Sequence, residues 1–163
     1  MIILKIILND IKLILFLNKY LTHNLNFNNI DELQVYFKEL FIKLKEIYDI
    51  KLTGYYYINV YVDKNYGVVL EMEKEEIEFI EYEENEVDMH IVLNECEFLY
   101  ELEDIFDYYE LLKYIDVYSY KNKYYGKIKN DISNSQYMKL IEMSTINYKN
   151  TKEIIKYGKK IET

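Results

Sequence analysis

A run of glutamates from Glu71 to Glu86 divides the 163-residue chain into two halves of similar design. Carboxylates this dense repel one another and resist burial. We interpret residues 74–86 as a partly ordered acidic connector, with a short helix or strand that buries one side as the alternative. The sequence predicts an α+β fold of two small modules, residues 1–73 and 87–163, each built from antiparallel strands or hairpins packed with helices.

The N-terminal module opens with two apolar runs, Ile2–Leu8 and Ile11–Leu17, separated by Asn9-Asp10. Asn and Asp tolerate the left-handed backbone of a two-residue hairpin turn. The pattern therefore predicts a β-hairpin, and a helix is the alternative. Lys5, Asn9, Asp10 and Lys12 interrupt this apolar region, which argues against a signal sequence or a membrane span.

A helix is predicted next, because six apolar residues recur three and four positions apart. They are Ile30, Leu33, Phe37, Leu40, Leu44 and Ile47. Asn29 is placed to cap the first turn, and Glu32 occupies the capping-box position. Strands are predicted at 52–62 and 68–72, since Tyr56, Ile58, Val60 and Val62 alternate with more polar positions before a turn that contains Gly67.

The C-terminal module shows short strands at 87–93 and 98–102, then a helix near 103–114. A second hairpin is predicted from strands 117–120 and 124–128. Two capping-box patterns, Ser133 with Gln136 and Asn150 with Glu153, predict two final helices, and Gly158 ends the second.

Composition excludes several classes of function. The net charge is −9 and arginine is absent, which argues against nucleic-acid binding because phosphates are neutralised by Lys and Arg. Half of the residues are apolar, enough for a packed core. The single cysteine, Cys96, cannot form an internal disulfide, so a reducing cytoplasm is the simplest compartment.

Residues suited to catalysis are sparse. The glycines are isolated, and no paired-cysteine or His-x-x-x-His spacing indicates zinc, so no metal and no cofactor is expected. Glu86, Asp88 and His90 share one strand face and form only a weak metal-site pattern. A Cys96–His90 pair would need adjacent strands, and Glu95 and Glu97 oppose thiolate formation. The sequence therefore predicts a protein that is not an enzyme.

Several short segments, in order along nearly the whole chain, resemble MecA-type adaptor proteins, which are negative regulators of competence in Gram-positive bacteria. The segments in the first half are 6–15, 36–41, 52–54, 58–60 and 66–70. Those in the second half are Phe98–Ile105, the Val117–Tyr125 hairpin and the closing Lys156–Ile161.

This resemblance implies a cytoplasmic adaptor in regulated proteolysis. The N-terminal module would capture a client protein, and the C-terminal module would bind a ClpC-type AAA+ unfoldase. Exposed tyrosines give rigid contact area, so we expect Tyr118, Tyr120, Tyr124 and Tyr125 to form a partner surface. Packing of alternate tyrosines beneath the final helices is the competing interpretation. The alternative function is an acidic interaction protein, such as a phage-type inhibitor or a nucleic-acid mimic.

Overall fold

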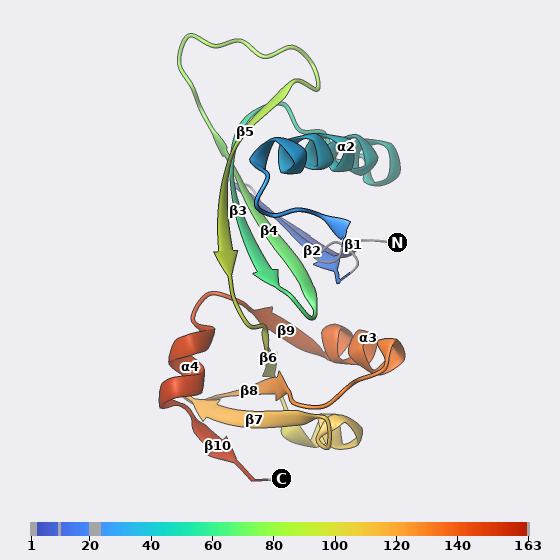
Figure 1. The fold of residues 1–163 in the computed structure, drawn as a ribbon, viewed down its shortest axis with the longest axis vertical. Helices are drawn as coiled ribbons and strands as arrows, with labels where there is room; N and C mark the ends of the chain where they lie inside the picture. Colours follow the sequence, from blue (N-terminus) through green and yellow to red (C-terminus); the bar gives the residue numbers. More distant parts are fainter. Residues whose placement is uncertain (1–2, 10, 20–23, 163) are drawn as a thin grey trace. The chain divides into compact units, whose positions relative to one another are not determined.

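The computed structural model describes residues 3–9, 11–19 and 24–162, and the chain forms an α+β fold with two compact units, Met1–Glu95 and Cys96–Thr163. The first unit contains β1 (Ile3–Leu8), β2 (Lys12–Asn18), α2 (Ile30–Tyr48), β3 (Gly54–Asp63), β4 (Gly67–Glu75) and β5 (Val87–Glu95). Its five strands form one sheet in the order β1-β2-β4-β3-β5 (Figure 1).

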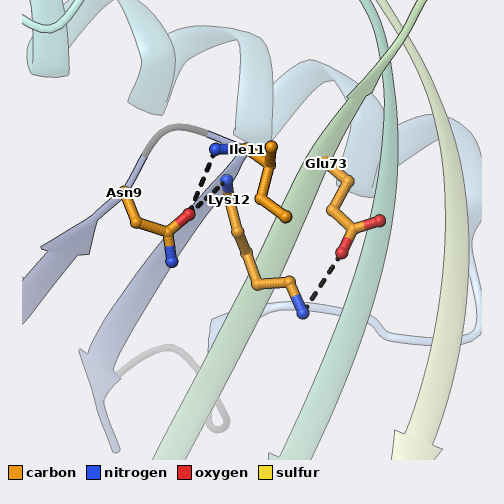
Figure 2. Close-up of polar contacts among 4 residues, drawn as sticks. All are labelled: Asn9, Ile11, Lys12 and Glu73. Atoms are coloured by element: carbon orange, nitrogen blue, oxygen red, sulfur yellow. Dashed lines mark hydrogen bonds and ion pairs between the residues drawn. The ribbon is translucent and has the colours of Figure 1, made fainter.

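The predicted N-terminal hairpin is confirmed: β1 and β2 pair antiparallel, although Ile2 and Asp10 of the prediction lie outside the described residues. Asn9 organises the turn, since its side-chain oxygen accepts hydrogen bonds from the amides of Ile11 at 3.1 Å and Lys12 at 2.8 Å (Figure 2). The Lys12 ammonium then lies 3.1 Å from the Glu73 carboxylate, which links β2 to β4.

Helix α2 covers one face of this sheet. The Asn29 side chain accepts a hydrogen bond from the Glu32 amide, as predicted for the N-cap. The four central residues of the predicted stripe are buried, but Ile30 and Ile47 at its ends are exposed, which corrects the prediction. Phe41, which the predicted stripe did not include, is buried, because it packs in the same core cluster as its neighbour Leu40.

The alternation predicted for β3 is confirmed. Tyr56, Ile58, Val60 and Val62 are buried in the α2-facing core, and the intervening residues are partly exposed. β3 and β4 pair antiparallel from Tyr55↔Glu75 to Asp63↔Gly67. Gly67 has a φ of +140°, and a Cβ there would collide with the Leu17 carbonyl, so the start of β4 requires glycine.

The predicted boundary at residue 87 is wrong. β5 pairs in parallel with β3 from Gly54↔Val87 to Val62↔Glu95, so residues 87–95 complete the first sheet. Its alternate residues Val87 and Met89 are buried in the core beneath α2, which explains why the strand belongs there. The predicted connector, residues 74–86, therefore lies inside the first unit: residues 74 and 75 belong to β4, and 76–86 form an irregular loop between β4 and β5.

The second unit has its own five-stranded sheet, in the order β10-β7-β8-β6-β9 (Figure 1). Its elements are β6 (Leu99–Leu102), the 3-10 helix η1 (Ile105–Leu111), β7 (Ile115–Tyr120), β8 (Lys123–Ile128), α3 (Asn134–Met143), β9 (Ser144–Asn147), α4 (Thr151–Tyr157) and β10 (Lys159–Ile161). β9 and β10 were not predicted, and η1 replaces the helix predicted near 103–114.

The two predicted capping boxes differ. At α3 both bonds form, because Ser133 accepts from the Gln136 amide at 3.2 Å and Gln136 accepts from the Ser133 amide at 3.1 Å. At α4 the Asn150 side chain makes no cap hydrogen bond and instead accepts from the Asn147 side chain at 3.0 Å. The second capping box is therefore wrong, although the helix and its end at Gly158 are confirmed.

Within the described residues, the model contains no helix with both the length and the apolar character needed to cross a bilayer.

Candidate functional site

The four tyrosines predicted to form a partner surface do not share one face. Residues paired across a ladder point the same way, and Tyr118 pairs with Tyr125 in the β7–β8 hairpin. Tyr120 has the same alternation, so these three side chains lie on the face that carries α4. Tyr124 pairs with Ser119 and points to the opposite face.

Tyr125 is a core residue. It is only 7% exposed and packs with Leu99 and with Ile154 of α4, while Tyr118 and Tyr120 are partly buried against this cluster. Burial raises the pKa of Tyr125, and the nearby Glu101 carboxylate adds to the shift. The packing interpretation thus describes Tyr125, and partly describes Tyr118 and Tyr120.

Tyr124 is the most accessible tyrosine of the hairpin, at 37% exposure. It lies next to the two-residue turn at Lys121 and Asn122, whose φ angles of 48° and 64° suit the tight turn of a hairpin. The Lys121 ammonium lies 5.2 Å from the centre of the Tyr120 ring. The hairpin end therefore offers one aromatic and two lysines, Lys121 and Lys123, to solvent.

The weak metal and thiol patterns also have defined positions. Asp88 and His90 do lie on one face of β5, where the His90 ring stacks at 5.1 Å on Tyr57. No group of three His, Cys, Asp or Glu residues is arranged to hold a metal ion within the described ranges. β5 and β6 are not paired and belong to different sheets, so the hairpin that would bring Cys96 beside His90 does not form.

A groove of about 540 Å³ lies on the first unit, between α2 and the start of β5. Its apolar residues are Phe41, Ile42, Leu52 and Val87. Ile42 is 57% exposed although it is a large aliphatic residue, so the groove presents an apolar surface to solvent. Sequence analysis missed this site, because Ile42 does not belong to the predicted core stripe of the helix. An isoleucine on the polar side of α2 was the one feature of the sequence that could have indicated the groove.

Charged groups of both signs surround this apolar floor. Lys38, Lys45 and Glu46 come from α2, and Glu86 and Asp88 come from the loop end and from β5, where the neutral Asn85 also lines the groove. The β5 side is held in place by two hydrogen bonds: the Gly54 amide donates to the Glu86 carbonyl at 2.9 Å, and the Asn85 amide donates to the Thr53 hydroxyl at 3.1 Å. An apolar floor with a few polar groups at its rim can accommodate an apolar group.

No protein-family model, curated protein or solved structure matches this chain.

Proposed function

We propose that the chain is a non-enzymatic adaptor that presents client proteins to a ClpC-type ATP-dependent unfoldase. The supporting observation is the division into two compact units, each with its own helix-packed sheet. An adaptor needs two contact surfaces rather than reactive groups, and joining them raises the effective concentration of one partner at the other. The resemblance to MecA-type adaptors assigns the client to the first unit and the unfoldase to the second.

The groove between α2 and β5 is the proposed client site. Unfolded proteins expose apolar side chains, and the groove offers Ile42 and Phe41 as its floor, with Lys45 and Glu86 at its rim. Because the rim carries both charges, we expect selection for apolar content rather than for one sign of charge.

Fluorescein-labelled casein, which is unstructured, is a suitable client probe for the full-length chain. We expect Ile42→Lys to weaken casein binding at least tenfold, about 1.4 kcal/mol. Ile47→Lys is the matched control, since Ile47 is an isoleucine of the same helix, is also exposed and does not line the groove. Fluorescence anisotropy that gives equal affinities for the two variants would contradict the client site.

The end of the β7–β8 hairpin is the proposed unfoldase contact. Tyr124 combines exposure with a fixed position in the sheet. Lys123, the preceding residue, points to the opposite face, where its charge pairs with Glu101 at 3.3 Å. A rigid aromatic of this kind is typical of residues that dominate protein–protein affinity.

Purified ClpC-type unfoldase with ATP provides the test, with the full-length chain immobilised on a biosensor. We expect Tyr124→Ala to weaken binding by about 2 kcal/mol, roughly thirtyfold. Tyr109→Ala is the control, because Tyr109 is 80% exposed in the same unit and lies outside the hairpin. No binding by the unaltered chain would overturn the proposed function.

A further inference from the structure

Among the described residues, β5 is the longest edge strand of the two sheets, and no other strand pairs with its outer edge. β5 has nine residues and pairs with β3 without a register shift. The other edge of that sheet, β1, has a register shift between Ile3 and Lys5, and the edges of the second sheet are the four-residue β9 and the three-residue β10. Proteins protect edges from pairing with bulges, short length and charged side chains, lysine in particular. β5 has no register shift and no lysine, and its carboxylates, Asp88 and Glu95, lie near its two ends.

The hydrogen bond from the Gly54 amide to the Glu86 carbonyl determines which β5 residues face this edge. In a regular parallel ladder, alternate residues bond the neighbouring strand, and those between them direct their N–H and C=O groups away from it. The even-numbered residues from Asp88 to Asn94 therefore bond β3. The odd-numbered residues, Val87, Met89, Ile91, Leu93 and Glu95, present free backbone groups.

We propose that β5 pairs with β5 of a second copy of this chain, antiparallel and with a two-fold axis at Ile91. In this register Ile91 lies opposite its own copy, Met89 opposite Leu93, and Val87 opposite Glu95. Each outward-facing residue of the strand then has an outward-facing partner, so the entire strand is used. A register centred on His90 would shorten the pairing and place the two imidazoles opposite each other.

The side chains on both faces suit this register. On the α2 face, Met89, Ile91 and Leu93 would form a continuous apolar row across the two copies, which covers the exposed Leu93. Glu95 of one copy would lie beside Val87 of the other, at the groove lined by Lys38 and Lys45 but also by the carboxylates of Glu46, Glu86 and Asp88. Its charge is already balanced by Lys64 at 3.6 Å, so the apolar row and not charge attraction favours this register. On the other face Asp88 would lie opposite an amide, Asn94, and no two like charges are paired.

The oligomeric state of the full-length chain tests this inference independently of the adaptor proposal. Sedimentation velocity over a concentration series is expected to show a monomer–dimer equilibrium. Ile91→Pro removes an N–H that faces the free edge and no bond to β3, so we expect a folded monomer, with the dimer dissociation constant raised at least tenfold. Ile91→Lys, which places two like charges at the axis, is expected to act in the same way if the proline variant is unstable.

Cross-linking tests the register. In a Cys96→Ser background, Ile91→Cys is expected to form a disulfide-linked dimer on mild oxidation, since hydrogen-bonded pairs lie about 5.5 Å apart between Cα atoms. Leu93→Cys is the control, because its two copies would lie beyond the roughly 7 Å limit for a disulfide. A monomer at all concentrations, or equal cross-linking at 91 and 93, overturns the proposal. A monomer that adds a foreign strand at β5 also overturns it, while the casein and unfoldase measurements still decide the adaptor function.

Discussion

The Gly54 amide donates a 2.9 Å hydrogen bond to the Glu86 carbonyl, and this bond ties the end of the acidic loop to the first residue of β3. Gly54 has a φ of +116°, a backbone conformation that residues other than glycine rarely adopt. The preceding residue, Thr53, adds a second contact, since its hydroxyl accepts a hydrogen bond from the Asn85 amide at the end of the same loop. Through these contacts β5 enters the first sheet and borders the groove beneath α2.

The core role of α2 predicts a large difference between two of its apolar residues. Phe37 is 1% exposed, so Phe37→Ala should destabilise the first unit by about 3–5 kcal/mol through lost burial and the cavity left behind. Ile47 is 62% exposed, so Ile47→Ala should change stability by less than about 0.5 kcal/mol. Urea unfolding followed by circular dichroism measures both, and similar losses would contradict the packing of α2.

The capping residues of α3 and α4 predict a second contrast. Ser133→Ala removes an acceptor that holds the Gln136 amide and should cost about 1 kcal/mol. Asn150→Ala should cost only a few tenths of that, because its side chain makes no cap hydrogen bond and loses a single exposed contact to Asn147. Thermal unfolding of the two variants tests this order, and an equal or larger loss for Asn150→Ala would show that the α4 cap does form.

The Lys12–Glu73 contact predicts a pH dependence of defined sign. The hydrogen bond to Glu73, together with the charge of Glu71, raises the pKa of Lys12 above its ordinary value of 10.5. A raised lysine pKa contributes stability that is complete below 10.5 and is lost as the pH rises through the folded-state pKa.

Lys12→Met should therefore destabilise the chain by up to about 1 kcal/mol at neutral pH, since the pair is partly exposed. The free-energy difference between the unaltered chain and this variant should shrink as the pH rises above 10.5. Urea unfolding at a series of pH values, with Lys12→Met/Glu73→Gln as the reference for other titrating groups, measures this difference. An increase with pH would contradict the assigned cause.

Local patterns predicted most of the elements, because caps and alternation depend on neighbours in the chain. Asn29 and Ser133 were identified as caps in this way, and so was the buried side of β3. The assignment of β5 to a sheet could not be predicted, since its parallel pairing with β3 is a long-range contact across β4 and the acidic loop. That loop resembled a boundary between modules because solvated carboxylates are compatible with both a connector and a surface loop.

The candidate sites show the same limit. Strand alternation already separates Tyr124 from Tyr125, but only the register with β7 shows that Tyr118 lies on the side of Tyr125, beneath α4. The groove depends on contact between α2 and the start of β5, so no single segment contains its signal. Residues that are distant in sequence line this groove, so its apolar floor and charged rim cannot be recognised from any one of these segments.

Amide hydrogen exchange along β5, resolved by residue with NMR, tests the placement of this strand and its free edge most directly. At low protein concentration we expect slow exchange at Asp88, His90, Val92 and Asn94, whose amides bond β3, and fast exchange at Met89, Ile91 and Leu93. As the concentration rises, the three fast amides should become protected while the others remain slow. Exchange that shows no alternation, or that stays fast at Met89, Ile91 and Leu93 at every concentration, would contradict this account.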